Sequence, residues 1–387
     1  MELFTLPLHV HPMATDLKIF LVAGEESGDI HGSNLIRQLK KLTDFSLFGT
    51  GGERLKILGQ KQYFNVNQMT IVGISEVFSK LPFILKMFKF LKRKLLEINP
   101  DIVILVDYPG FNLRFSKFAS EMGFKVVYFI APQIWAWHYS RIKKIKRHVD
   151  FVLCILPFEE EIFKSEGVDA KYIGNPVVDN IRINVTSKKE FYSVNKLRTD
   201  KKTIGIMPGS RKRELDALMP EILLAYQKLR DDFNFILPVA SNLSLEDVTR
   251  FTKNTDIKIV QNANYDVMKY ADLLWICSGT ATLEAAILEI PMIILYKVSK
   301  FTEMMGRLLI RTKFIGLPNI IGGEEIVAEL IQNRMNSKEI VENTYRVLED
   351  YSVIKSKLSG ISKNFLELNP SLEAATEIYS RFIGKNV

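Results

Sequence analysis

The sequence predicts an α/β protein with two doubly wound, Rossmann-like domains that face a central cleft. Short apolar runs typical of buried parallel strands alternate with helix-like segments along almost the whole chain. This alternation starts twice, at residue 17 and at residue 203, and each time a glycine-containing turn follows the opening strand. The length of 387 residues also fits two domains of ordinary size.

Each expected strand is a short apolar run between polar or glycine-containing turns. In the first half these runs are LKIFLVAG (17–24), FSLFGTGG (45–52), DIVILVDYPG (101–110), KVVYFIAP (125–132) and FVLCILPF (151–158). In the second half they are TIGIMPGS (203–210), FNFILPVA (233–240), IKIVQN (257–262), LLWICSG (273–279) and PMIILYKV (291–298). We therefore expect an extension at 1–16, a first domain at 17–185, a linker at 186–202, a second domain at 203–350 and a helical tail at 351–387.

The composition is globular, with 47% hydrophobic and 25% charged residues, and the formal charge of +8 fits an anionic partner. Cys154 and Cys277 lie in apolar runs, which favours core positions in a reducing cytoplasm and gives no metal-type spacing. The first residues lack the pattern of a signal peptide, and no apolar run is long enough for a membrane span. The sequence thus predicts a soluble or peripheral protein, with no nucleic-acid-binding motif.

Two stretches of the first domain combine strand ends with polar side chains. GEESGDIHG (24–32) leads into a helix whose N-terminus suits an anionic or sugar ligand; alternatively, Ser27 or Asp29 simply caps the helix. VDYPGFN (106–112) places Asp107 at the carboxyl end of a strong strand, where it can act as a general base or form an Asx turn. Ligands of such sheets bind at these strand ends.

The helix at 79–98 has too many apolar residues for one buried stripe, and lysines are interleaved with them. An apolar face beside lysines can bind an anionic membrane surface or an acyl chain, whereas the alternative is a core helix with snorkelling lysines. The candidates for membrane or acyl contact are Phe83, Ile84, Lys86, Met87, Phe88, Lys89 and Phe90.

The second domain contains two turns that could bind phosphate. Gly209 and Ser210 lie at an expected helix N-terminus, and Arg211 would add a bidentate donor. CSGTATLEAA (277–286) repeats this signal, and Glu284 lies one turn into its helix, within reach of a ribose hydroxyl. Two such turns could cradle a pyrophosphate, while Lys212 and Arg213 can remain solvated. The sequence lacks an Asp-x-Asp element, a Walker phosphate loop and a G-x-S-x-G elbow.

Taken together and in order, these motifs resemble the lipid-A-disaccharide synthase family, which consists of inverting glycosyltransferases of the two-domain GT-B type (family 19). The match starts near residue 17 and covers nearly the whole chain. It includes AGEESGD, VGISEV, DYPGFN, WAWHYSRIKKIKR, LPFE, IGNPV, PGSRKRE, SGTATLEAA, PMIILYK and LPNIIGG…ELIQ.

The resemblance implies a metal-independent enzyme without a cofactor, acting in the biosynthesis of lipid A of Gram-negative lipopolysaccharide. It would transfer 2,3-diacylglucosamine from UDP-2,3-diacylglucosamine to 2,3-diacylglucosamine 1-phosphate, giving a β-1,6-linked disaccharide 1-phosphate and UDP. The implied location is cytoplasmic, peripheral on the anionic inner face of the cytoplasmic membrane. Family members also swap C-terminal segments, which would give a homodimer.

The family motifs imply roles for individual residues. Asp107 matches an essential aspartate that either abstracts a proton or orients the acceptor. The other catalytic candidates are Glu25, Ser27 and Asp29. The UDP-binding candidates are Gly209, Ser210, Arg211, Glu214, Ser278, Gly279, Thr280, Glu284, Asn319 and Gln332.

Three positions depart from the family pattern. Gly110 replaces a common aspartate, Glu26 stands where a small residue is usual, and His31 stands where an aliphatic one is common. Two other functions fit parts of the pattern: another GT-B enzyme such as a UDP-GlcNAc 2-epimerase, or a non-catalytic, basic, membrane-associated protein.

Overall fold

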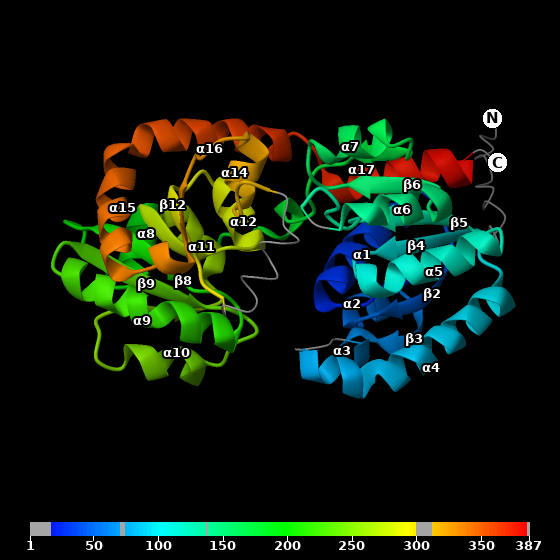
Figure 1. Ribbon diagram of the computed structural model, residues 1–387, viewed down its shortest axis with the longest axis horizontal. Coiled ribbons are helices and arrows are strands. Elements are labelled where there is room, and N and C mark those ends of the chain that lie inside the picture. Colours follow the sequence, from blue (N-terminus) through cyan, green and yellow to red (C-terminus); the bar gives the residue numbers. More distant parts are fainter. Residues whose placement is uncertain (1–16, 70–73, 137, 299–311, 385–387) are drawn as a thin grey trace, which may run out of the picture.

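A computed structural model of the chain describes residues 17–69, 74–136, 138–298 and 312–384. For residues 74–80 it describes the backbone only. The predicted extension at 1–16 lies outside the described residues. The described part forms two parallel β-sheets flanked by helices, in two lobes that lie side by side (Figure 1). This arrangement confirms the predicted α/β class with two doubly wound domains.

The first sheet has seven parallel strands in the order β3-β2-β1-β4-β5-β6-β7. The central strand at 102–106 is apolar throughout and fully buried, and the strand at 125–129 is buried after its exposed Lys125, since helices cover both faces of the sheet. The strands are β1 (Lys18–Ala23), β2 (Ser46–Gly51), β3 (Lys61–Asn65), β4 (Ile102–Val106), β5 (Lys125–Phe129), β6 (Phe151–Cys154) and β7 (Ala170–Tyr172).

Helices follow most strands of this sheet and bury one apolar stripe against it, which gives one core cluster on each face. They are α1 (Glu26–Leu39), α2 (Glu53–Ile57), α3 (Val66–Met69), α4 (Ile74–Ile98), α5 (Pro109–Glu121), α6 (Ile142–His148) and α7 (Glu159–Ser165). Two 3₁₀ turns, η1 (Tyr139–Arg141) and η2 (Val178–Asn180), and helix α8 (Lys188–Val194) complete the segment before the second sheet.

The second sheet has six parallel strands in the order β10-β9-β8-β11-β12-β13, packed around a core that includes the fully buried Trp275. The strands are β8 (Lys202–Met207), β9 (Phe233–Val239), β10 (Lys258–Gln261), β11 (Leu273–Cys277), β12 (Met292–Tyr296) and β13 (Ala328–Ile331). The helices among them are α9 (Lys212–Leu229), α10 (Leu245–Thr252), α11 (Asn264–Tyr270), α12 (Thr280–Ile287) and α14 (Leu317–Gly322), followed by the 3₁₀ turn η3 (Gln332–Arg334).

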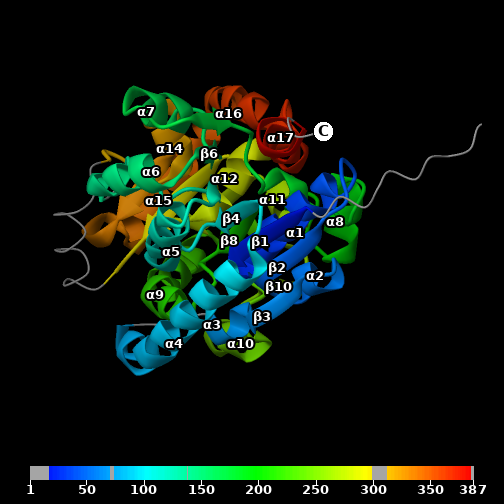
Figure 2. The same ribbon diagram turned by 90° about the vertical axis from the view of Figure 1, so that its right-hand side faces the viewer.

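The C-terminal helices contact both lobes. After α15 (Ser337–Glu349), helix α16 (Tyr351–Leu366) packs on α12 of the second lobe, and α17 (Pro370–Ile378) packs on α1 of the first (Figures 1 and 2). The Tyr172 hydroxyl donates to the Asn364 carbonyl at 3.0 Å, and Ser371 hydrogen-bonds Asp179. The last element of the described residues is the π-helical turn η4 (Tyr379–Ile383). The last helices therefore return the chain to the first lobe.

The strand orders fix where each lobe can bind a ligand. In the first sheet the order reverses between β1 and β4, and in the second between β8 and β11. At such a reversal, the loops after the two central strands turn to opposite faces and leave a crevice at the carboxyl edge. The motif-bearing loops therefore lie where an α/β sheet binds its ligand.

Candidate functional site

The loops after β1 and β4 meet at the reversal point of the first sheet. The two strands pair in parallel, with Ala23 opposite Val106, so Gly24 and Asp107 start neighbouring loops. A Cβ on Gly24 would lie 2.2 Å from the Tyr108 ring, so this position must be glycine for the loops to approach. The structure thus brings the GEESGD and DYPGFN motifs together.

Asp107 lies in a tightly bonded turn between β4 and α5. Its φ of +46° is left-handed, its N–H donates to the Phe129 carbonyl at 3.0 Å, and its own carbonyl accepts from two buried side chains. Burial, and then the nearby charge of Glu25, raise the pKa of the Asp107 carboxyl to about 6. A carboxyl with a pKa near neutrality is suited to general-base catalysis.

The other catalytic candidates of the first lobe lie at the start of α1. Glu25 is the exposed N-cap residue, and Ser27 is exposed in the first turn. Asp29 is fully buried, and its carboxylate accepts backbone N–H groups from Gly52 at 2.7 Å and from Arg54 and Leu55 at 3.2 Å. Asp29 therefore holds the start of α2. Helix capping is the alternative role that the sequence predicts for Asp29, and the helix that it caps is α2 rather than its own. We therefore leave Asp29 out of the proposed catalytic set.

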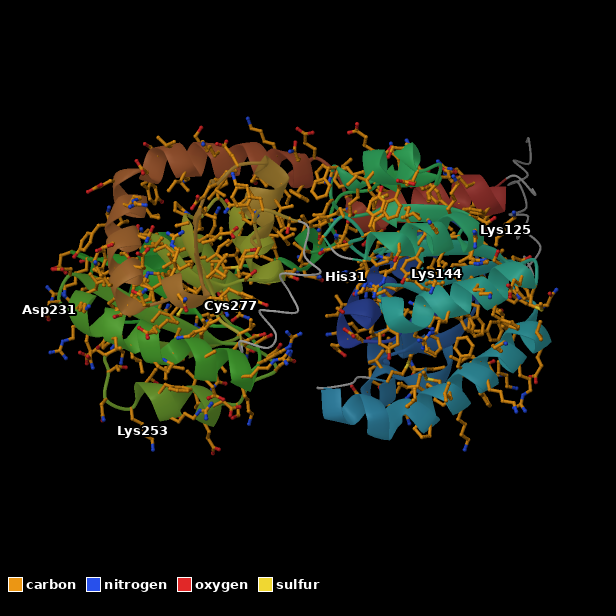
Figure 3. All side chains as sticks on the ribbon, in the orientation of Figure 1. His31, Lys125, Lys144, Asp231, Lys253 and Cys277 are labelled. Carbon is orange, nitrogen blue, oxygen red and sulfur yellow. The ribbon has the colours of Figure 1, made fainter. Side chains whose placement is uncertain are left out.

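Glu26 and His31, the two residues on α1 that depart from the family pattern, lie in different surroundings. Glu26 is exposed and pairs with Arg54 at 2.5 Å. His31 lies on the side of the first lobe that faces the second (Figure 3), and its Nδ1 is buried without a hydrogen-bond partner among the described residues. Burial lowers the pKa of His31 to about 4, so the side chain is neutral at physiological pH.

The two glycine–serine turns of the second lobe are adjacent. β8 and β11 pair in parallel, with Met207 opposite Ile276, so the turns after them lie at one edge of the sheet. Burial raises the pKa of Cys277 to about 12; the Glu214 charge adds to this shift, and the Arg211 charge opposes it. The charges of α9 therefore act on the end of β11, as two converging turns require.

The turn before α9 is closed by a side chain of the helix. Glu214 accepts the Ser210 N–H at 2.9 Å, the Arg211 N–H at 3.1 Å and the Arg211 guanidinium at 3.1 Å. Gly209 has a φ of +112°, and a Cβ there would lie 2.3 Å from the Glu214 carboxylate. The sequence predicted a helix N-terminus available to phosphate, but these N–H groups already bond a carboxylate in a capping box.

The turn before α12 differs from the turn before α9 because no acidic side chain of the first helical turn closes it. Its N-cap residue Gly279 and the following Thr280 are exposed, and no side chain of the described residues caps the helix. Ser278 donates its hydroxyl to the Ile315 carbonyl at 3.2 Å, which ties the turn to the loop before α14. The α12 N-terminus therefore presents its first backbone N–H groups and the positive end of its dipole.

Glu284 has a partner that the sequence did not predict. Its carboxylate accepts the Tyr265 hydroxyl at 3.0 Å, and burial raises the pKa of the Glu284 carboxyl. Tyr265 lies on α11, and no local motif marks it; only the three-dimensional structure places it beside Glu284. The hydroxyl fixes the orientation of the carboxylate.

Asn319 and Gln332 are engaged by the chain itself. Asn319 is fully buried: its amide donates to Val327 at 2.8 Å and Glu329 at 2.9 Å, and its oxygen accepts two backbone N–H groups. The Gln332 amide pairs with both backbone polar groups of Val298, at 2.8 and 3.2 Å. Both side chains hold loops at the carboxyl edge, and a direct contact with UDP stays a prediction for each.

Most of the apolar residues proposed for membrane contact on α4 pack inward. Met87 is fully buried, Phe88 packs edge-on against Phe111 and Phe115, and Phe83 and Phe90 pack against Phe64. Ile84 is partly buried against the same core. The core alternative therefore accounts for these side chains.

The outer side of α4 retains exposed apolar and basic side chains that fit the predicted contact with a membrane surface. Leu81 and Leu85 are 42% and 59% exposed, beside the exposed Lys86 and Lys89. Among the helices of the described residues, none has the length and apolar character that a membrane span requires.

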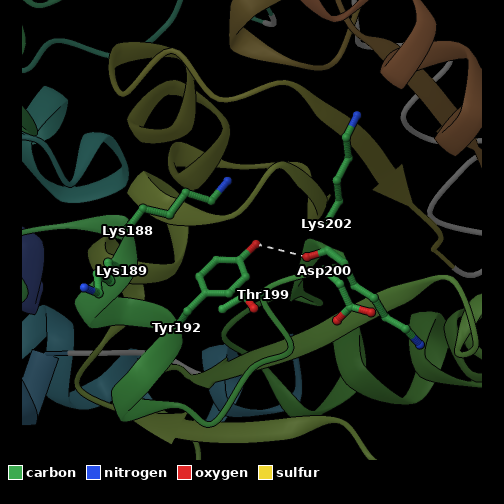
Figure 4. Close-up of a pocket in the computed structure, with 7 residues that line it drawn as sticks. Lys188, Lys189, Tyr192, Thr199, Asp200 and Lys202 are labelled. Atoms are coloured by element: carbon green, nitrogen blue, oxygen red, sulfur yellow. Dashed lines mark hydrogen bonds between the residues drawn. The ribbon is translucent and has the colours of Figure 1, made fainter.

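A separate open cavity of 380 Å³ lies beside α8 and is lined by lysines, Tyr192, Thr199 and Asp200 (Figure 4). The Tyr192 hydroxyl donates to the Lys201 carbonyl at 3.4 Å. Lys202 starts β8, so this cavity is at the amino edge of the second sheet, opposite the turns at 208–211 and 278–280. It is therefore not part of the candidate site.

Comparisons with known sequences agree over the length of the chain. The family model described as "Lipid-A-disaccharide synthetase" matches residues 19–378. A lipid-A-disaccharide synthase of Geobacter sulfurreducens is 36% identical over 381 residues, covering 96% of this chain and 99% of the relative. One from Trichlorobacter lovleyi is 39% identical and covers 86% and 88%, respectively.

Comparisons with solved structures support the fold. The UDP-GlcNAc 2-epimerase of Neisseria meningitidis bound to UDP-GlcNAc matches with a TM-score of 0.64 at 15% identity, covering 95% of this chain and 100% of that one. The glycotransferase of kitacinnamycin matches with a TM-score of 0.66 at 13% identity, covering 95% and 99%. At such low identity these likenesses establish the two-domain GT-B fold and carry no assignment of activity.

Proposed function

Since the chain belongs to the family of lipid-A-disaccharide synthases, which are glycosyltransferases, we propose that its donor is UDP-2,3-diacylglucosamine and its acceptor 2,3-diacylglucosamine 1-phosphate. The products would be the β-1,6-linked disaccharide 1-phosphate and UDP. The family match over residues 19–378 carries this assignment. The placement of Asp107 and Arg211 at the reversal points of the two sheets supports it.

Asp107 is the proposed general base. The acceptor 6-hydroxyl attacks the anomeric carbon of the donor while the bond from that carbon to the UDP oxygen breaks, which inverts the configuration. The hydroxyl proton passes to the Asp107 carboxylate, whose pKa of about 6 leaves it ionised at neutral pH. With a φ of +46°, Asp107 lies in a left-handed turn just after β4, at the carboxyl edge of the first sheet, where its carboxylate would meet the acceptor.

The second lobe is the proposed UDP site. Backbone N–H groups at the start of α12 would bind the diphosphate, and the Arg211 guanidinium would offset the charge of the leaving UDP without a metal. Glu284, oriented by Tyr265, would accept a hydrogen bond from a ribose hydroxyl. In this proposal, α9 contributes the Arg211 side chain rather than its backbone N–H groups, because Glu214 already bonds them.

The proposed location is the inner face of the cytoplasmic membrane, because both substrates carry acyl chains. Leu81, Leu85, Lys86 and Lys89 form the exposed, apolar and basic side of α4 that would contact anionic lipid. We expect a Lys86→Gln/Lys89→Gln variant to sediment less with anionic vesicles, at unchanged turnover of detergent-dispersed substrate. Normal sedimentation would contradict this assignment. A homodimer stays a prediction from the family resemblance.

The direct test is to incubate the protein with donor and acceptor and measure UDP and disaccharide. Asp107→Asn should lower turnover roughly 10²- to 10⁴-fold, because it removes the base while keeping the shape of the side chain. A chain that leaves these substrates unchanged and interconverts UDP-GlcNAc with its 2-epimer would instead be an epimerase. Full turnover in Asp107→Asn would exclude Asp107 as the base, and vesicle binding without turnover would indicate a non-catalytic protein.

A further inference from the structure

Tyr128 is a buried hydroxyl beside the proposed base, and no motif of the sequence includes it. It lies on β5, opposite Leu105 of β4, and its side chain is fully buried. The hydroxyl reaches beyond the end of the neighbouring strand and donates to the main-chain carbonyl of Asp107 at 2.8 Å. A buried tyrosine hydroxyl needs a hydrogen-bond partner, and here that partner is the main chain of the proposed base.

The carbonyl that Tyr128 bonds belongs to an unfavourable backbone turn. Asp107 and Tyr108 have φ values of +46° and +48°, and two successive non-glycine residues in the left-handed region are uncommon. Such a conformation persists only where surrounding contacts hold it, and it is found preferentially at functional sites. The turn therefore depends on its hydrogen-bond partners.

Among the described residues, three hydrogen-bond partners hold the main chain of Asp107 in this turn. The Asp107 N–H continues the sheet ladder to Phe129 at 3.0 Å. The buried Asn112 amide donates to the Asp107 carbonyl at 2.7 Å and to the Val106 carbonyl at 3.1 Å. Tyr128 supplies the second side-chain donor to the Asp107 carbonyl, and of the two it is the one that comes from the neighbouring strand.

We propose that Tyr128 is a positioning residue, which fixes the left-handed conformation of Asp107 and thereby directs the catalytic carboxylate. This inference rests on the proposed function of Asp107 as the base. Tyr128 touches the main chain and not the reacting atoms, so its effect on the reaction passes through Asp107. Loss of its hydroxyl should therefore reduce the chemical step and leave substrate binding unchanged.

The charged groups around the turn set the pKa of Asp107. They therefore determine how the pH dependence of kcat would change if the Tyr128 hydroxyl were lost. Glu25 from α1 raises the pKa of Asp107, and the Tyr108 backbone N–H lowers it. On the other side, the Arg141 charge acts on Tyr128, as does that of Asp107. Burial is the largest cause of the raised pKa of Asp107, so a released carboxylate would become better hydrated and its pKa would fall.

The test is a double-mutant cycle in the full-length protein with Tyr128→Phe and Asp107→Asn. Tyr128→Phe should lower kcat about tenfold, as expected for one lost hydrogen bond to a buried carbonyl, with KM unchanged. In the Asp107→Asn background, the same substitution should have no further effect on the residual rate. In the single variant Tyr128→Phe, the acidic limb of the pH–kcat profile should also move to lower pH. The control is Tyr226→Phe, which removes a buried hydroxyl that accepts the Asp256 N–H at 2.8 Å in the second lobe.

Each outcome separates the two proposals. A normal kcat and pH limb in Tyr128→Phe, or an equal loss in both backgrounds, would overturn the positioning role while leaving Asp107 as the base. Full activity of Asp107→Asn would instead contradict the proposed base, and with it the role of Tyr128. If Asp107→Asn has no measurable rate, the shift of the pH limb in Tyr128→Phe decides.

Discussion

The N-termini of α9 and α12 follow neighbouring strands and similar glycine–serine turns, yet they hold different partners. At α9, Glu214 in the first turn bonds the N–H groups of Ser210 and Arg211. At α12, the first turn contains no acidic residue, and Gly279 and Thr280 are exposed. A glycine–serine turn thus marks a helix N-terminus, but the first turn of the helix decides whether its N–H groups are available.

This difference divides the proposed work between the two helices. An uncapped N-terminus can bind phosphate oxygens through its backbone and its dipole. An N-terminus that already holds a carboxylate can contribute through its side chains, here through Arg211, whose side chain is 64% exposed. We therefore expect UDP binding to depend on the backbone of α12 and on the side chain of Arg211.

A carboxylate placed at the open N-terminus of α12 should have the largest effect on UDP binding. Thr280→Glu places a carboxylate at the exposed first residue of α12, and we expect UDP affinity to fall roughly 100-fold through repulsion of the diphosphate. Thr280→Gln is the neutral control of the same size and should bind UDP nearly normally. Isothermal titration with UDP measures both; equal affinities would show that the diphosphate lies elsewhere.

Removing the proposed side-chain contribution of α9 should have the next largest effect. Arg211→Ala should weaken UDP binding roughly 30-fold, because a charge-assisted hydrogen bond to phosphate is lost. Lys212→Ala is the matched control, since Lys212 pairs with Asp247 at 2.8 Å. Similar losses in the two variants would indicate a general effect of charge rather than a contact with Arg211.

Glu214→Ala tests whether the occupied N–H groups of α9 take part in binding. The variant loses a capping box, and we expect the free energy of unfolding to fall by about 1 kcal/mol, which lowers Tm by a few degrees. Because the N–H groups of α9 are not part of the proposed site, UDP affinity should change less than about twofold. Thermal melts and titrations measure the two effects. Because Glu214 also accepts the Arg211 guanidinium, the substitution is repeated in the Arg211→Ala background; a large gain in affinity there would show that both helix ends can bind the diphosphate.

The smallest expected effect concerns pH and the first lobe. With the Asp107 pKa raised to about 6, kcat should be lost as the pH falls through this value, because the base becomes protonated. Glu25→Gln removes a like charge, which lowers the pKa of Asp107 and moves the acidic limb to lower pH. Arg211→Ala, in the other lobe, should leave this limb in place. A pH–rate series for the three proteins checks this; an unshifted limb in Glu25→Gln would contradict the coupling.

The sequence predicts the fold well because parallel strands buried on both faces read as apolar runs. IVILV in β4 and LLWIC in β11 are recognisable without any partner. The carboxyl-edge positions of Asp107, Gly209 and Gly279 follow from the same alternation. These predictions rest on local patterns, which is why one sequence is sufficient for them.

The parts that the sequence did not predict depend on contacts between distant segments or on a shift of one residue. Tyr265 and Tyr128 reach their partners from other elements, and no spacing in the chain marks them. At α9 the N-cap is Arg211, one residue after Ser210, and the helix itself starts at Lys212. This places Glu214 at the third helical position, where it can close the turn. For α4, composition alone did not separate the buried Phe88 from the exposed Leu85, because both belong to one long apolar helix.

The most direct test of the proposed division is a structure of the full chain with UDP bound. The proposed division predicts that the diphosphate lies within hydrogen-bond distance of the N–H groups at Gly279 and Thr280 and of the Arg211 guanidinium. It further predicts that Glu214 still bonds the N–H groups of Ser210 and Arg211. A diphosphate seated on those two N–H groups, with Glu214 turned away and α12 unoccupied, would contradict it.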